Sequence, residues 1–173
     1  MTPRRGARAP ARRVRERGSR YTSASEGAVV VDASIAFLWF ANEPDRSGAR
    51  RLLDGTSHLL APDLMAVEAT NAWWKKLRRG EIEPSDVEQA VTLLLALGIA
   101  WTPAAALLRP AARLAVDLGH PVYDCLYLAL AAAHAAPIAT ADERLRKAAE
   151  RIGLRVWGTA RRHDARSPSA SRF

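Results

Sequence analysis

The sequence predicts an α/β protein, namely a three-layer α/β/α sandwich built around a central parallel sheet of four to five strands. The first observation is the apolar run Ala28 to Val31, which contains three consecutive valines. Such a run suits a strand buried on both faces, as in a parallel sheet covered by helices. The second is that short apolar runs alternate with helical segments along the chain. This alternation indicates parallel strands joined by helical crossovers.

Each expected strand is a short apolar run bounded by turn residues. We expect four strands, with a fifth at the edge of the sheet: 28–31, 58–61, 99–102, 137–140 and, at the edge, 154–157. The residues that end these strands are of most interest, because open parallel sheets bind ligands at the carboxyl ends of their strands.

The segments between the strands carry helix signals at their ends. Pro62-Asp63 opens a long helix that ends at Arg79-Gly80, with proline in its first turn and basic residues in its last. The helix expected over 122–134 is rich in alanine and leucine, and this predicts burial on most sides. Pro110 is expected to interrupt or kink the helix over 104–118. The other helices are expected over 34–40, 84–97 and 142–152, with a short one before Gly55.

The two ends of the chain differ in composition from the rest. The net charge is +8, but residues 1–27 carry eight arginines and two glutamates, and residues 160–173 carry four arginines and one aspartate. Residues 28–159 are therefore close to neutral, and we expect them to form one domain. The ends hold too few apolar side chains to offset the entropy of ordering, so we expect disordered tails. The first tail is either a nucleic-acid-binding arm or a passive extension, and a self-sufficient domain starting at Ala28 favours the passive extension.

Composition excludes several classes of protein. No apolar run approaches the roughly 20 residues of a membrane span, and no secretory signal is expected. The single cysteine, Cys125, rules out an internal disulfide and a cysteine-based zinc site, and it favours a cytoplasmic protein. The chain has no glycine-rich phosphate loop, so a nucleoside-triphosphate enzyme is not expected.

Four carboxylates occupy positions that suggest a shared site. Asp32 and Asp142 each follow an expected strand, so both should lie at the carboxyl edge of the sheet. Glu68 lies in the middle of a helix, on one face with Asn71, and Asp124 lies in the first turn of the apolar helix. Taken singly, each acid has an ordinary explanation as a helix cap, a dipole-stabilised helix terminus or a solvated side chain.

Together the four acids favour a metal site. Carboxylates that converge without a cation repel one another, and this repulsion raises some of their pKa values and destabilises the fold. A hard divalent cation removes the conflict, and oxygen-only ligation favours Mg²⁺ or Mn²⁺, as one or two ions. Such ions can activate water, neutralise charge and stabilise the leaving oxygen in phosphodiester cleavage.

Four segments, in order, resemble the PIN-domain nucleases. They are Val30-Val31-Asp32-Ala33-Ser34, residues 62–72, residues 123–129 and residues 140–145, and the resemblance covers about residues 28–157. The short single-domain form is most similar to the VapC-type toxins of toxin–antitoxin pairs. The resemblance implies a Mg²⁺- or Mn²⁺-dependent endoribonuclease with an acidic quartet of Asp32, Glu68, Asp124 and Asp142. It also implies polar support from Ser34, Asn71 and Thr140, a small cognate antitoxin as inhibitor, and a homodimer.

Two alternatives to a toxin nuclease remain at this point. One is a non-catalytic PIN module that binds RNA or a protein partner. The other is a haloacid-dehalogenase-like phosphatase, which normally has a second aspartate two positions after the first, where this chain has Ser34. Other residues are expected to be structural: His120 as a loop histidine, because the turn at Pro121 makes a shared helix face with Asp124 doubtful, and Tyr127 as a packed side chain.

Overall fold

The computed structural model describes residues 27–40 and 46–158, and the tails expected over 1–27 and 160–173 lie outside the described residues apart from Gly27. The described chain contains a four-stranded sheet in which every pairing is parallel. The strands are β1 (Ala28–Val31), β2 (His58–Pro62), β3 (Ala100–Thr102) and β4 (Ile138–Ala139), in the order β3-β2-β1-β4. The predicted α/β class and parallel sheet are therefore confirmed.

The fifth strand expected over residues 154–157 does not form as a strand. Only Val156 makes a bridge, to Ile138, supported by hydrogen bonds from the Ile138 amide to the Arg155 carbonyl and from the Trp157 amide to the Ile138 carbonyl. β4 itself has only two residues, so it offers too short an edge for a longer ladder.

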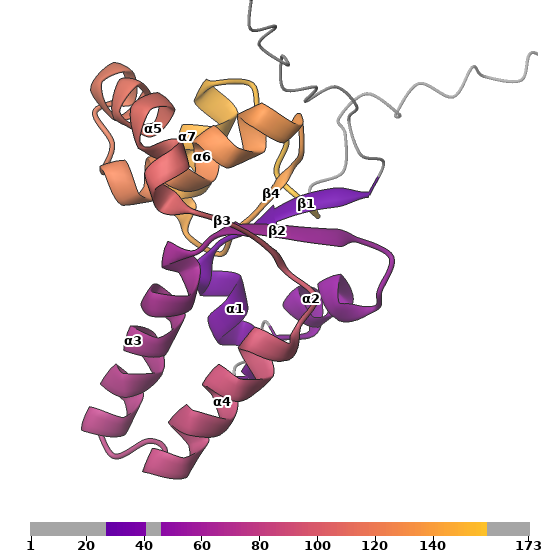
Figure 1. Cartoon of the computed structure of the whole chain (residues 1–173), viewed down its shortest axis with the longest axis vertical. Helices are drawn as coiled ribbons and strands as arrows, with labels where there is room; N and C mark the ends of the chain where they lie inside the picture. Colours follow the sequence, from indigo (N-terminus) through magenta and orange to yellow (C-terminus); the bar gives the residue numbers. More distant parts are fainter. Residues whose placement is uncertain (1–26, 41–45, 159–173) are drawn as a thin grey trace, which may run out of the picture.

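Helices cover both faces of the sheet and complete three layers (Figure 1). One layer contains α1 (Ala33–Phe40), α2 (Arg46–Arg50), the 3₁₀ turn η1 (Arg51–Leu53), α3 (Leu64–Arg78) and α4 (Pro84–Ala96). The other contains α5 (Ala104–Leu118), α6 (Val122–His134) and α7 (Glu143–Arg151). α3 and α4 form a hairpin that extends beyond the sheet. α5 runs through Pro110 as one helix rather than as two separate segments.

The core lies between the sheet and the two layers. All four residues of β1 are buried, as expected for the central position of this strand between β2 and β4. α6 is buried at seven consecutive positions, Cys125 to Ala131, because it packs against the sheet on one side and α5 on another. The predicted burial of this helix is confirmed. None of the helices in the described part of the chain is both long and apolar enough to cross a membrane.

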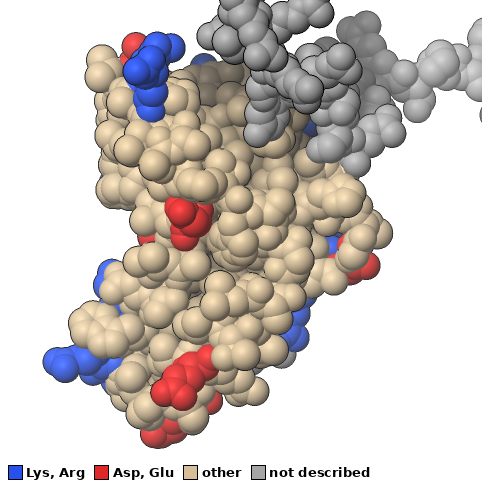
Figure 2. Space-filling model, viewed as in Figure 1, with Lys and Arg blue, Asp and Glu red and all other residues tan. Residues whose placement is uncertain are grey.

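Charged side chains on the face drawn in Figure 2 stand in small separate groups, several of them near the end of the α3–α4 hairpin. Most of that face is uncharged, and it shows no continuous basic strip.

Candidate active site

Asp32 lies at the carboxyl end of β1 and is the only charged residue that is fully buried in the described part of the chain, with 5% of its surface exposed. Its Oδ1 accepts hydrogen bonds from the Ser34 amide and the Ser34 hydroxyl, both at 2.5 Å, and from the Ile35 amide at 3.3 Å. Its Oδ2 accepts a hydrogen bond from the Thr140 hydroxyl. Burial raises the pKa of Asp32, although these hydrogen bonds oppose the rise. Asp32 is thus both the cap of α1 and a desolvated carboxylate.

The register of the sheet explains why Thr140 reaches Asp32. Val31 pairs with Ala139, so the residues that follow β1 and β4 emerge side by side. The Ser34 hydroxyl also accepts a hydrogen bond from the Ala141 amide, at 2.8 Å. Two hydroxyl groups therefore connect the two strand ends around one carboxylate. Ser34 and Thr140, both expected as polar support, contact Asp32 directly.

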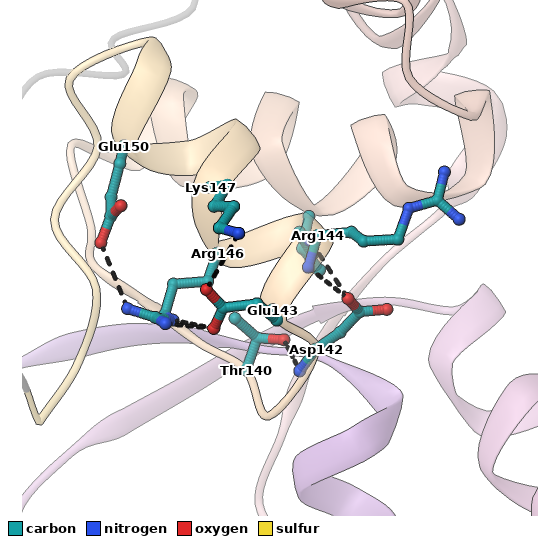
Figure 3. Close-up of polar contacts among 8 residues, drawn as sticks. Thr140, Asp142, Glu143, Arg144, Arg146, Lys147 and Glu150 are labelled. Atoms are coloured by element: carbon teal, nitrogen blue, oxygen red, sulfur yellow. Dashed lines mark hydrogen bonds and ion pairs between the residues drawn. The ribbon is translucent and has the colours of Figure 1, made fainter.

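Asp142 follows β4 and lies exposed at the N-terminus of α7. Figure 3 shows its carboxylate facing the start of the helix, where Oδ1 accepts hydrogen bonds from the Arg144 amide at 2.7 Å and the Leu145 amide at 3.3 Å. The amide of Asp142 donates to the Thr140 hydroxyl at 2.9 Å, so Thr140 links Asp142 to Asp32. Both aspartates therefore lie at the same edge of the sheet.

Glu68 approaches this edge from α3, on the opposite helix layer from α6. Its Oε2 accepts a hydrogen bond of 2.5 Å from the Tyr127 hydroxyl of α6. Burial raises the pKa of Glu68, and the nearby charges of Asp124 and Asp32 raise it further, whereas the Tyr127 bond lowers it. Tyr127 was expected to pack in the core, and it does. Its bond to Glu68 was missed, since nothing in a sequence pairs positions 59 residues apart.

Asp124 lies in the first turn of α6, and His120 lies in the loop before this helix, as expected, but its contact with Asp124 was not foreseen. The His120 Nε2 is 2.8 Å from the Asp124 Oδ2. Gly119 ends α5 in a left-handed conformation, with φ of 62°, and the chain then enters α6 through Pro121, so that the loop residue His120 lies beside Asp124. The four-residue spacing was the available signal.

Asp124 is electrostatically linked to the other acids. Burial raises its pKa most, the charge of His120 lowers it, and the charge of Asp142 raises it. Because the charges of Asp124 and Asp32 also act on Glu68, all four expected acids belong to one interacting group. Asn71, by contrast, is exposed on α3 and makes no hydrogen bond to these acids within the described chain.

The donor set consists of carboxylate oxygens and therefore fits a hard divalent cation. Burial raises the pKa values of Asp32, Glu68 and Asp124, and repulsion from neighbouring acids raises those of Glu68 and Asp124 further. In the described residues, no three histidine, cysteine or acidic side chains converge into a ready-made cage. The acids stand around the site on separate elements. Closer approach without a cation would add to their repulsion.

A cavity of about 460 Å³ adjoins the acids between α1 and α3. Ser34 and Ala141 form the edge that it shares with the Asp32 site, and Phe37 and Leu38 give it an apolar wall. Lys75 lies on its α3 side.

Comparisons with known proteins agree with the fold. The PIN domain family model matches residues 29–151. Ribonuclease VapC3 of Pyrobaculum aerophilum is 34% identical over 121 residues, a stretch that covers 68% of this chain and 91% of the relative. A crystal structure of PAE2754 from Pyrobaculum aerophilum superposes with a TM-score of 0.54 at 25% identity, covering 72% of this chain and 83% of the other.

Proposed function

The chain belongs to the PIN-domain family, and from this premise we propose that it is a metal-dependent endoribonuclease that acts as the toxin of a VapBC-type toxin–antitoxin pair. The observation that carries the proposal is the grouping of four acids at the carboxyl edge of the sheet: Asp32, Glu68, Asp124 and Asp142. The similarity to a protein named as a ribonuclease supports RNA as the substrate class.

The proposed mechanism assigns the four acids to holding one or two Mg²⁺ or Mn²⁺ ions. A bound ion would supply an activated water and offset the charge of the reacting phosphate. Ser34 and Thr140 fix the orientation of Asp32, and Tyr127 reaches from the other helix layer to fix that of Glu68, so both carboxylates are preorganised. His120 holds Asp124 in the same way. The adjoining cavity provides room for a nucleoside next to the reacting bond.

The phosphatase alternative has less support. Ser34 stands where that class carries its second aspartate, and here the Ser34 hydroxyl donates to Asp32 instead of acting as an acid. We therefore retain the non-catalytic PIN module as the principal competitor, and the experiment below separates the three.

We propose a cytoplasmic protein with a cognate antitoxin that covers the acidic site. A cationic side chain of the antitoxin, arginine or lysine, would lie near Asp32 and Asp124 and compete with metal or RNA. We also propose a homodimer, for which α3 offers an exposed apolar strip: Trp74 is 49% exposed and Val67 is 65% exposed.

Cleavage of an RNA panel tests the nuclease proposal. We expect the full chain to cut single-stranded RNA with Mg²⁺ or Mn²⁺, to lose activity in a chelator, and to leave a phosphomonoester substrate intact. The Asp124→Asn variant should cut at least about 100-fold more slowly, in the range found when one transition-state contact is removed. RNA binding without cleavage would favour the non-catalytic module, and phosphomonoester hydrolysis would favour the phosphatase.

Growth in the presence of the expressed protein tests the toxin role separately. Expression of the full chain should arrest growth, and co-expression of a small adjacent reading frame encoding the antitoxin should relieve the arrest. Harmless expression of a folded chain that cleaves RNA in the test tube would contradict the toxin role while leaving the nuclease proposal in place.

A further inference from the structure

Arg144 is a cation at the edge of the acidic site for which the proposed mechanism has no role. It lies in the first turn of α7, two residues after Asp142, and is exposed. In Figure 3 its guanidinium extends away from the other charged side chains of α7 and carries no ion pair. Its backbone amide, not its side chain, makes the bond to Asp142.

The other cations of α7 are engaged. Arg146 pairs with Glu143 and lies 3.6 Å from Glu150, and Lys147 lies 3.5 Å from Glu143 (Figure 3). Arg151 donates to the Leu118 carbonyl at 3.1 Å. No described acid lies within ion-pair distance of the Arg144 guanidinium. Arg144 therefore differs from its neighbours on the same helix in having a charge that no close partner neutralises.

The charge of Arg144 nevertheless acts on the site. Burial raises the pKa of Asp124 and His120 lowers it, and the charge of Arg144 adds a smaller lowering effect. The guanidinium thus lies close enough to influence Asp124, but it does not block the carboxylates by pairing with them. A cation in this position is suited to an anion that arrives from solution.

RNA supplies such an anion. Its phosphates would be repelled by the four carboxylates, and a cation at their edge offsets that repulsion. Arginine presents a planar fork of donors that matches the oxygens of a phosphate. We propose that Arg144 forms a phosphate subsite, binding a backbone phosphate of the RNA strand beside the carboxylates. This inference rests on the proposed ribonuclease function and adds to it the residue that positions the strand.

The test compares Arg144→Ala with Arg146→Ala, which removes the same charge from the same helix. Both variants keep the bonds of the Asp142 cap, because these are made by backbone amides. Binding of a fluorescent single-stranded RNA is measured by anisotropy over a range of salt concentrations, and kcat and KM are measured with the same RNA and Mg²⁺. Thermal unfolding of each variant checks that the fold is retained.

We expect Arg144→Ala to weaken RNA binding and raise KM by about 10- to 100-fold, the usual effect of losing a hydrogen bond to a charged group. The slope of log affinity against log salt should fall by about 0.7, the value for one phosphate contact on a single strand. Arg144→Lys should recover part of the affinity, and Arg146→Ala should change it by less than about threefold.

Two different failures would be distinguishable. Equal affinities and equal salt slopes for Arg144→Ala and Arg146→Ala would overturn the phosphate subsite, whether or not the wild-type chain cleaves RNA. Absence of cleavage by the wild-type chain with every metal would overturn the nuclease proposal, and the binding measurements would still decide the role of Arg144.

Discussion

Asp32 and Asp142 present the same local pattern, a short apolar strand followed by an acid and a helix, yet the fold gives them different environments. Asp32 follows the central strand β1 and is 5% exposed, whereas Asp142 follows the edge strand β4 and is exposed. Four donors, including two hydroxyls, surround Asp32. Among the described hydrogen bonds, the carboxylate of Asp142 accepts only from the amides that begin α7.

The difference shows that the place of a strand in the sheet decides how far the acid after it is desolvated. A central strand is flanked by neighbours whose ends close over the carboxylate, as β4 does through Thr140. An edge strand leaves its following acid open on one side. Burial of the Asp32 carboxylate therefore costs free energy, whereas Asp142 contributes to helix stability. The proposed function requires both to act in one metal site.

The largest expected effect is on RNA cleavage, where substitutions of Asp32 and Asp142 should behave alike. Asp32→Asn and Asp142→Asn should each reduce cleavage by about 100-fold or more, and the double variant should be little worse than either, because groups that act as a unit are not additive. Single-turnover cleavage rates measure this. Asparagine is a good helix cap, so full activity in Asp142→Asn would show that Asp142 serves only as a cap.

The next largest expected effect is on stability, where substitutions of Asp32 and Asp142 should behave differently. Asp142→Ala removes the bonds to the Arg144 and Leu145 amides and should lower the free energy of unfolding by about 1 kcal/mol, while Asp142→Asn should leave it nearly unchanged. Asp32→Asn removes a buried charge and should instead leave the metal-free protein as stable or more stable. Urea unfolding without metal measures all three. If Asp32→Asn lowered the free energy of unfolding as much as Asp142→Ala does, the two aspartates would not differ in their contribution to stability.

The smallest expected effect is on the pH dependence of stability. Burial raises the pKa values of Asp32 and Glu68 above their ordinary values near 3.8 and 4.5, so the folded state binds more protons than the unfolded state in that window. The free energy of unfolding therefore falls as pH rises from about 4.5 through the raised pKa values. Three other acids have lowered pKa values and change the stability only at lower pH, namely Asp54, Glu81 and Glu143.

Melting temperatures of the metal-free protein check this sign. The wild-type protein should melt at a higher temperature near pH 5 than near pH 7.5, and Asp32→Asn should show a smaller difference because one of the contributing carboxylates is gone. Saturating Mn²⁺ should reverse the trend, because metal binding requires the deprotonated acids. An identical profile in the variant would mean that Asp32 does not titrate in this range.

The sequence was sufficient to predict the parallel sheet, both helix layers and the two strand-end aspartates, because hydrophobic periodicity and turn residues are local signals. Contacts between residues that are far apart in the sequence could not be predicted in this way. The Tyr127–Glu68 bond joins residues of separate helices, and whether Asp32 or Asp142 would be buried depended on strand order, which no local pattern encodes. The contact between His120 and Asp124 could have been predicted from their four-residue spacing, but the turn at Pro121 made it doubtful.

The Tyr127–Glu68 bond ties α6 on one side of the sheet to α3 on the other. The position of Glu68 relative to α6, which also carries Asp124, is therefore set by two helices and not by a surface loop. Because Tyr127 is almost fully buried, the core around it fixes the position of the hydroxyl that meets Glu68. In the proposed function, the position of Glu68 and the packing of the core then form a single cooperative unit, so that a change in the packing of α3 or α6 would move a proposed metal ligand.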